Sequence, residues 1–225
     1  MATLGQVVGD EPTQELVEHR RSLWDYYDRR VTGRLPGLAN ACDYWTGRGV
    51  EVEIGDIASE ATRVEEHLRE LSPQSYVDVG AGPGTFTGLL PGTGIALDQS
   101  RRALAVLRGV APEVPAVQAD ALQLPLPDQA VTRFFSAHLY GLLLPNERQA
   151  FLAEGHRVAT EVVILDAGRP LGVRAEEWQE RTLPDGGCFK VFRRHFDPEV
   201  LAAEVGGDVL FGGHFYVLVR FPRSC

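Results

Sequence analysis

Three glycines follow a short apolar run, and this stretch carries the clearest chemical signal in the chain. The run 76–79 is typical of a buried parallel strand, and Gly80, Gly82 and Gly84 come directly after it. Glycine lets the backbone turn at positive φ and leaves main-chain N–H groups open to a ligand. Because residues 85–90 can open a helix, the stretch predicts a cradle for a nucleotide-like ligand. The alternative is a tight strand-to-helix turn that binds nothing.

Acidic side chains end or lie beside three successive predicted strands, at Asp78, Asp98 and Asp120. In an open parallel sheet, ligands bind beyond the carboxyl ends of the strands. Asp98 lies about 20 residues beyond the glycines, a spacing at which an acid accepts hydrogen bonds from ribose hydroxyls. Asp120 would then lie where an adenine amine could donate. One such acid alone is more often a solvated loop residue, but three in register favour a nucleotide site.

The elements that must position these residues alternate between strands and helices. Strands are predicted at 76–79, 94–97, 114–118, 131–136 and 161–165, with helices between them. This alternation indicates right-handed crossovers and a mostly parallel sheet covered on both faces. Two further strands, 209–211 and 215–221, flank a glycine turn and predict an antiparallel hairpin. The expected fold is therefore α/β, Rossmann-like and doubly wound, with seven strands and a C-terminal antiparallel hairpin.

Two regions outside the sheet are expected to shape a substrate pocket. Residues 1–72 are predicted to be an N-terminal helical cap or lid, and 73–225 the core, with an insertion around 169–195. The aromatic and basic candidates in these regions are Trp24, Tyr26, Tyr27, Arg30 and Trp178. The first helix either closes over the cradle or only packs on the core. For Trp45 and Trp178, covering the sheet is the favoured interpretation.

Composition excludes several classes of function. The chain has 225 residues, 44% of them hydrophobic, and a formal net charge of −9, with no basic run that would favour nucleic acid as a partner. No apolar stretch reaches the ~20 residues of a membrane span, and the first ten residues lack a secretion signal. The three cysteines lack CxxC spacing, so we expect a reducing, cytoplasmic location and no metal. One lysine among many arginines suggests a bacterial source.

Taken together, these motifs resemble those of the class I S-adenosylmethionine-dependent methyltransferases. The resemblance covers about residues 71–166. Residues 77–84 are similar to the family's first motif, 95–100 to its second and 118–128 to its third. Residues 135–138 are similar to the segment after the family's fourth strand, and 163–166 to its fifth strand. It implies S-adenosyl-L-methionine as cofactor, S-adenosyl-L-homocysteine as product and a small-molecule acceptor methylated on oxygen, nitrogen or carbon.

The resemblance also implies a set of cofactor contacts. Gly80 and Gly82 would face the methionine part of the cofactor, Asp98 would hold the ribose, and Asp120 with Ala121 would line the adenine. The full expected set is Tyr27, Asp78, Gly80, Ala81, Gly82, Asp98, Gln99, Asp120, Ala121 and Ser136. Two features depart from the family pattern: Pro91 interrupts the helix after the glycines early, and Thr132 stands where the family usually has an acid.

His138 is the predicted general base, because it follows the fourth strand and histidine titrates near neutral pH. Tyr140 is predicted to line the same pocket. The alternative for His138 is a packed loop histidine, and His195 and His214 are more distant rivals.

Two other functions stay open: a non-catalytic methyltransferase-like partner subunit, and a nicotinamide-dependent oxidoreductase, which the single lysine disfavours. A homodimer is one option for its assembly.

Overall fold

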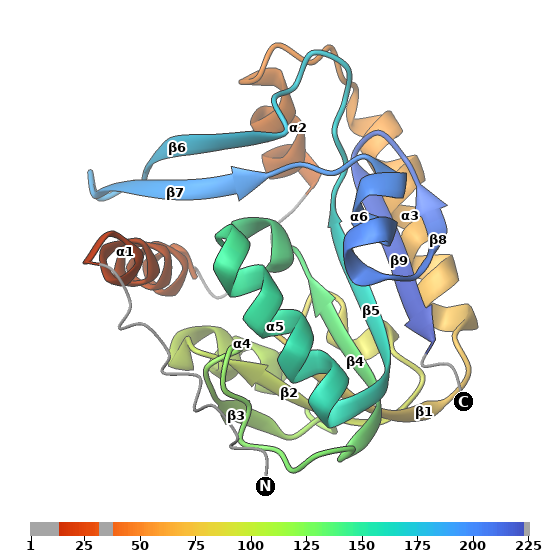
Figure 1. The fold of residues 1–225 in the computed structure, drawn as a ribbon. Coiled ribbons are helices and arrows are strands. Elements are labelled where there is room, and N and C mark those ends of the chain that lie inside the picture. The colour runs from red at the N-terminus through yellow and green to blue at the C-terminus, as the bar shows by residue number, and fades with distance from the viewer. Residues whose placement is uncertain (1–13, 32–37, 223–225) are drawn as a thin grey trace, which may run out of the picture.

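The computed structural model describes residues 14–31 and 38–222, and Figure 1 shows their central sheet with helices on both faces. The sheet has seven strands in the order β3-β2-β1-β4-β5-β9-β8. They are β1 (Gln74–Val79), β2 (Gly92–Asp98), β3 (Ala116–Gln118), β4 (Val131–Ala137), β5 (Ala159–Ala167), β8 (Asp208–Gly212) and β9 (Tyr216–Pro222). The first five run parallel, and β8 and β9 form an antiparallel hairpin, with β9 antiparallel to β5. The predicted fold class is confirmed.

Apolar side chains on both faces of the sheet hold the helices. On one face, α5 (Pro145–Val158) and α6 (Pro198–Val205) pack Phe151 and Leu201 into the cluster that contains Val77 and Phe134. On the other face, α3 (Ile54–Glu70) packs against residues of β1, β4 and β5. Helix α4 (Arg101–Val110) covers β2. The central strands β1, β4 and β5 are thus largely buried from both sides, as their apolar sequences predict, whereas the edge strand β3 is mostly exposed.

The connection after the glycines differs from the predicted helix. Residues 85–90 form only a 3₁₀ turn, η1 (Thr87–Leu89), before β2 begins at Gly92. Pro91 lacks an N–H and cannot continue a helix, so the turn ends there. The glycine turn therefore has no α-helix N-terminus behind it, and a ligand there would gain little from a helix dipole.

Helix α3 also differs from its predicted place in a cap. Its buried residues Val64 and Leu68 join Tyr76 and Phe135 in one core cluster, so it covers the sheet. The helix begins at Ile54, and Asp56 Oδ2 accepts the N–H of Glu53 at 3.2 Å. The predicted boundary at residue 72 stays a prediction.

The remaining elements gather beyond the carboxyl ends of the strands (Figure 1), and we call them the cap. The cap consists of α1 (Gln14–Arg30), α2 (Leu38–Thr46) and a separate antiparallel hairpin, β6 (Glu176–Thr182) and β7 (Cys188–Arg194). Ser22 Oγ donates to Lys190 O at 3.1 Å, and Arg29 pairs with Asp185 at the hairpin tip at 2.5 Å. Both strands fall within the insertion that is predicted around 169–195.

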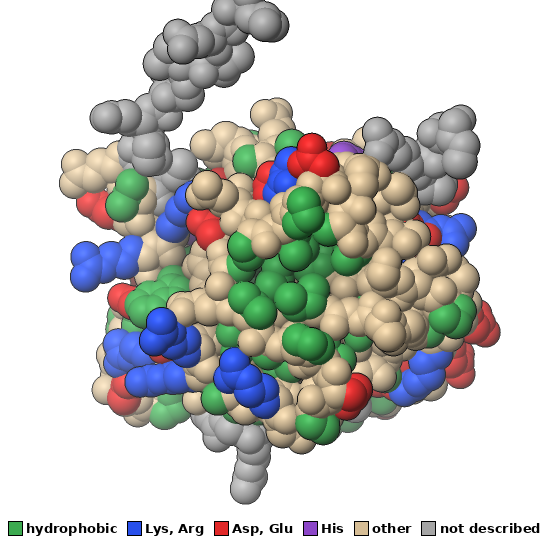
Figure 2. Space-filling view, turned by 90° about the horizontal axis from the view of Figure 1, so that it is seen from below, with side chains coloured by type: hydrophobic (Ala, Val, Ile, Leu, Met, Phe, Trp, Pro, Cys, Tyr) green, Lys and Arg blue, Asp and Glu red, His purple; other side chains and the backbone are tan. Residues whose placement is uncertain are grey.

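The face opposite the cap has a different character. Seen from below, in Figure 2, apolar side chains occupy the middle of this face and most charged ones lie toward its rim. Scattered apolar groups are ordinary on protein surfaces and indicate no site by themselves. None of the helices within residues 14–31 and 38–222 is long and apolar enough to cross a membrane.

Candidate active site

The glycine turn forms the floor of the candidate site. Gly80, Gly82 and Gly84 have φ of 72°, 56° and 91°, values that side-chain-bearing residues rarely adopt. A Cβ at Gly80 would lie 2.6 Å from Leu139 Cδ2, so close packing requires that glycine. A Cβ at Gly82 would meet nothing nearer than 4.0 Å. Only Gly82 therefore leaves open room beside the main chain for a ligand.

Asp98, at the end of β2, is tied to this turn. Its Oδ2 accepts the N–H of Gly82 at 2.8 Å, and its Oδ1 accepts the N–H of Ser100 at 2.7 Å. Each carboxylate oxygen has a further lone pair, so the group can still accept from a ribose diol. Burial raises the pKa of Asp98, the hydrogen bonds from Ser100 and Gly82 oppose that rise, and the nearby Asp28 charge adds to it. Two donors from a ligand would favour the charged form further.

Asp120, Ala121 and Gln99 surround the same strand ends. The N–H of Ala119 donates to Asp98 O at 3.1 Å, which places the segment after β3 beside Asp98. Asp120 Oδ1 accepts the N–H of Leu122 at 2.9 Å and is partly exposed, as is Ala121. Their roles as adenine contacts stay predictions that this placement permits.

Asp78 and Ser136 face inward, contrary to the predicted cofactor contacts. Asp78 is buried, and its Oδ2 accepts the hydroxyl of Thr87 at 2.7 Å. Ser136 is fully buried and donates to Val79 O at 2.7 Å. The two side chains secure the backbone on either side of the glycine turn, so they position the site from beneath. Burial raises the pKa of Asp78 to about 7, against the opposing hydrogen bond from Thr87.

Helix α1 reaches the cofactor side of the site. Asp28 Oδ1 accepts the hydroxyl of Ser100 at 2.6 Å, and Trp24 Nε1 lies 3.5 Å from Gln99 O. Tyr27, predicted to contact the cofactor, places its hydroxyl 2.9 Å from Arg181 Nη1 of the hairpin. One face of α1 thus lies against Asp98's neighbours, while Tyr27 turns toward β6.

His138 lies at the end of β4, on the acceptor side of the glycine turn. It has a φ of 58°, an uncommon conformation for a residue other than glycine, and its N–H donates to Leu165 O at 2.8 Å. Such conformations cluster at functional sites. The imidazole is 36% exposed and lies between the rings of Phe86 and Tyr216, with centroids 5.8 Å and 5.7 Å away. A molecule above the sheet edge can therefore reach it.

An ion pair lies directly behind His138. Asp166, at the end of β5, is fully buried and pairs with Arg193 Nη2 of β7 at 2.6 Å; its Oδ1 is 3.9 Å from His138 Nδ1. Burial is the largest single influence and would raise the pKa of Asp166, but the Arg193 charge, His138 and the Gly141 N–H together outweigh it and lower the pKa to about 2. Asp166 is therefore ionised and can orient the imidazole and stabilise its protonated form.

Tyr140 and the two rival histidines occupy other places. Tyr140 is buried, packs on Phe151 and donates its hydroxyl to Glu204 Oε2 at 3.2 Å, which indicates a structural role. His195 is buried within the cap, where its Nε2 lies 2.7 Å from Tyr44 Oη, and burial together with the Arg193 charge lowers its pKa to about 4. His214 precedes β9 and its N–H donates to Glu60 at 2.8 Å.

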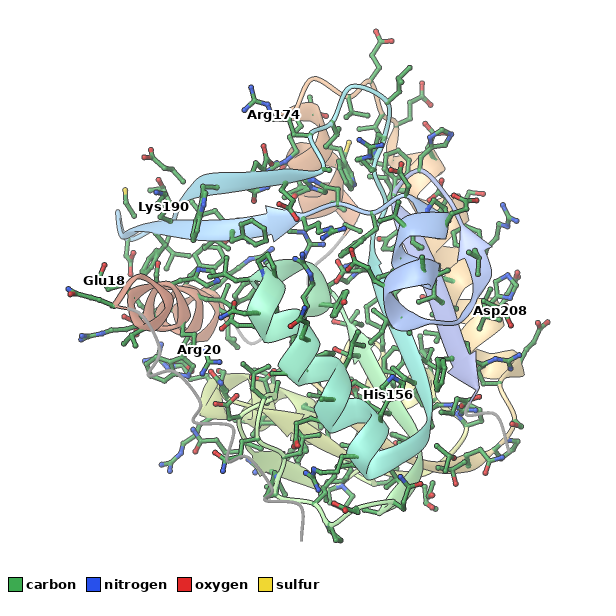
Figure 3. The ribbon with its side chains drawn as sticks, in the orientation of Figure 1. Glu18, Arg20, His156, Arg174, Lys190 and Asp208 are labelled. Carbon is green, nitrogen blue, oxygen red and sulfur yellow. The ribbon has the colours of Figure 1, made fainter. Side chains whose placement is uncertain are left out.

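Sequence reasoning missed the polar side chains that the cap brings to the site, above all Arg181 and Arg193. Figure 3 shows how many side chains occupy the space between the hairpin, which bears Lys190, and α1, which bears Glu18 and Arg20. The local sequence offers little signal for this strand, because Trp178 is the one apolar residue within Glu176–Thr182. The face on which Arg181 lies therefore could not be assigned from the sequence.

Beyond this edge, an open depression of about 790 Å³ lies between the start of α3 and the loop after β5; its lining includes Asp56, Glu60 and Phe215. It is separate from the glycine turn and Asp98. Within the described part of the chain, no three or more His, Cys, Asp or Glu side chains are grouped to hold a metal ion.

The comparison with known families decides the assignment. A family model described as a methyltransferase domain matches residues 77–162, which contain the glycine turn, Asp98, Asp120 and His138. The match spans fewer than half of the 225 residues and assigns a methyltransferase domain to that segment. The predictions of a methyltransferase and of S-adenosylmethionine as its cofactor are confirmed at the level of this domain. No curated protein matches the sequence.

Several solved structures share the fold of this chain. A complex of DhpI with SAH has 18% identity and a TM-score of 0.67, covering 93% of this chain and 99% of that one. A DhpI complex with SAM and HEP has 20% identity and a TM-score of 0.67, covering 90% and 97%. The glycopeptide N-methyltransferase MtfA with sinefungin has 19% identity and a TM-score of 0.54, covering 73% and 93%. At these identities the likeness concerns the fold, and for DhpI it extends over nearly the whole of both chains.

Proposed function

We propose that this methyltransferase transfers the methyl group of S-adenosylmethionine to a small molecule held between the glycine turn and the cap. The observation that carries the proposal is the bond between Gly82 N–H and Asp98, which brings an open stretch of main chain and a ribose-type acid into one place. The residues present fit the cofactor, since Gly82 leaves room for the methionine tail and Asp98 retains acceptor capacity for the ribose. The complex of DhpI with SAM and HEP, a fold relative, adds support.

Methyl transfer requires alignment more than activation. A lone pair of the acceptor attacks the methyl carbon, the carbon–sulfur bond breaks, and the sulfur keeps the bonding electrons and becomes a neutral thioether. The protein must hold nucleophile and methyl in line. If the acceptor atom carries a proton, His138 is placed to accept it, and the carboxylate of Asp166, 3.9 Å from Nδ1, would stabilise the imidazolium.

A small acceptor is favoured by the place of the cap. The hairpin and α1 contact each other over the carboxyl edge, through Tyr26, Leu183 and Val191, and so cover the site. A covered site of this kind suits a small molecule better than an extended polymer. The atom methylated, a cytoplasmic location and a homodimer stay predictions, as does the absence of a nucleic-acid partner.

Calorimetry with S-adenosylhomocysteine tests the cofactor site. We expect Asp98→Ala to weaken binding by about 2–3 kcal/mol, because charge-assisted hydrogen bonds are lost. Asp208→Ala is the control, since that exposed acid lies at the start of β8, away from the site (Figure 3). Equal affinities in the two variants would contradict the assignment, and binding of NAD instead would favour an oxidoreductase.

A second experiment separates catalysis from mere binding. The protein is incubated with isotopically labelled S-adenosylmethionine and a metabolite extract, and labelled products are sought by mass spectrometry. We expect a labelled small molecule with the wild-type protein and much less with His138→Ala if the acceptor atom is protonated. Tight cofactor binding without any labelled product would support the non-catalytic partner subunit.

A further inference from the structure

The cap hairpin carries charged and polar side chains on its inner face. Strand residues alternate between faces, so residues in register share a side. The inner face carries Glu177 opposite Arg193, Gln179 opposite Val191, and Arg181 opposite Phe189. Val191 identifies this as the inner face, since it is fully buried against Tyr26. Charges at such a place require either partners or a ligand.

Arg181 has only neutral partners among the described residues. Its Nε and Nη2 donate to Gln179 Oε1 at 3.0 Å and 2.6 Å, and its Nη1 donates to the hydroxyl of Tyr27 at 2.9 Å. Its guanidinium lies 5.2 Å from the ring centroid of Tyr26 and 6.0 Å from that of Tyr44. None of these groups supplies the full negative charge that would balance a guanidinium withdrawn from water.

Arg193 does have a carboxylate, but a shared one. Asp166 also accepts the N–H of Gly141 at 2.7 Å and that of Ala167 at 2.7 Å. The second amino group of Arg193 lies 3.3 Å from His138 O. This contact places Arg193 at the end of β4, beside the strand that leads to Gly80. Arg193 thus lies on the acceptor side of the glycine turn, near the candidate base.

The positive charges of both arginines act on the hydroxyl of Tyr27. Burial favours its neutral phenol, but the positive charges of Arg181 and Arg193 lower its pKa. The whole chain carries a net charge of −9, yet the guanidinium of Arg181 has no carboxylate among its described partners. Local charge of the opposite sign to the rest of a protein is typical of a site built for a charged ligand.

We propose that Arg181 and Arg193, with the Tyr27 hydroxyl, bind an oxyanion of the methyl acceptor, such as a carboxylate or a phosphate group. A planar guanidinium matches both groups with two parallel hydrogen bonds. Arg181 is partly exposed, so a ligand can reach it. That the oxyanion belongs to the methyl acceptor rests on the proposed function, whereas the existence of the oxyanion site does not.

The test is calorimetric titration of inorganic phosphate and of acetate into the protein saturated with S-adenosylhomocysteine, at constant ionic strength. We expect at least one of the two to bind, and its Kd to rise at least tenfold in Arg181→Gln. Arg181→Lys keeps the charge without the fork and should lose less. Arg169→Gln is the matched control, because that arginine pairs with Asp197 outside the site, and its Kd should change less than twofold.

Several results would overturn the proposal. They are absence of binding to the wild-type protein, equal binding to wild type and Arg181→Gln, and an equal loss in Arg169→Gln. If Arg181→Gln does not fold, the same comparison is made with Arg181→Lys, and an unchanged Kd there has the same meaning.

A further pair of ligands identifies the source of the oxyanion. S-adenosylhomocysteine carries an amino-acid carboxylate, and 5′-methylthioadenosine lacks it. If Arg181→Gln weakens binding of the first at least tenfold and leaves the second unchanged, the arginine holds the cofactor's own carboxylate and the proposal is wrong. If the wild-type protein binds neither nucleoside, the proposed function fails, and phosphate binding to the free protein then decides whether the oxyanion site exists.

Discussion

The two sides of the candidate site are built in different ways. The cofactor side uses main-chain groups and short acidic side chains from one continuous stretch, residues 78–120, in which Gly82 and Asp98 bond directly. The acceptor side uses long side chains from distant segments, since Tyr27 and Arg181 are 154 residues apart in sequence. Main chain held by a sheet is rigid, whereas long side chains adapt to what they bind. We infer that the rigid part of the site suits the cofactor and that the adaptable part suits the acceptor that we propose.

The buried ion pair between Asp166 and Arg193 should show the largest effect on stability. Asp166→Asn leaves the buried guanidinium of Arg193 without its carboxylate, and we expect the free energy of unfolding to fall by about 3–5 kcal/mol. Asp197→Asn breaks an ion pair of similar length, 2.5 Å, that is partly exposed, and should cost at most about 1 kcal/mol. Denaturant unfolding measures both. Similar losses of unfolding free energy in the two variants would mean that the Asp166–Arg193 pair stabilises the protein no more than a surface ion pair.

The same ion pair should make the stability of the protein depend on pH. The pKa of Asp166 is lowered to about 2 in the folded protein, so the stability that it contributes is present above about pH 4 and is lost as pH falls toward 2. Asp166→Asn should remove this part of the acid sensitivity.

On the cofactor side, the glycine turn should tolerate no added methyl group at Gly80. Gly80→Ala must place Ala at a φ of 72° and a Cβ 2.6 Å from Leu139, so we expect a loss of about 1–3 kcal/mol in stability. Gly88→Ala is the matched control, because a Cβ there meets nothing within 4 Å. Thermal melting of the two variants compares them. A melting temperature that is unchanged in Gly80→Ala would show that the turn is not constrained as described.

Beneath the turn, Asp78 should make stability depend on pH. Burial raises its pKa to about 7, so between about pH 4 and 7 the folded protein binds more protons than the unfolded chain and stability falls as pH rises. Asp78→Asn can still accept from Thr87 without a charge, and should gain about 1–2 kcal/mol over the wild-type protein from pH 5 to pH 8. Urea unfolding at the two pH values tests this. A difference that does not change with pH would contradict the raised pKa.

The smallest effect is expected on the acceptor side, from Tyr27→Phe. This change removes one hydroxyl that bonds Arg181 and keeps the ring, so about 1 kcal/mol of oxyanion binding should be lost. Affinity for S-adenosylhomocysteine should stay within about twofold of the wild type. A larger loss for the cofactor than for phosphate would mean that Tyr27 belongs to the cofactor side, as the sequence predicts.

The same contrast explains what the sequence could predict. The seven sheet strands and the place of Asp98 follow from local patterns, because apolar runs, glycines and acids lie near one another in the chain. Strand β6 could not be recognised, since Glu176–Thr182 is mostly polar and is a strand only through its pairing with β7. Asp78 and Ser136 have the right types and places for a ligand, but their bonds to Thr87 and Val79 emerge only in three dimensions. A 3₁₀ turn stands in place of the helix expected after Gly84, because Pro91 follows two residues after Leu89 and cannot continue a helix.

Two neighbours on α1 bear on both sides of the site. Asp28 bonds Ser100 next to the ribose acid, and Tyr27 bonds the hairpin arginine. Because α1 contacts both sites, a ligand that holds α1 in place at one site lowers the cost of ordering it at the other. The affinities for the two ligands are therefore coupled. Occupancy of the nucleoside site should therefore sharpen phosphate binding, and equal phosphate affinity with and without S-adenosylhomocysteine would show that α1 transmits nothing.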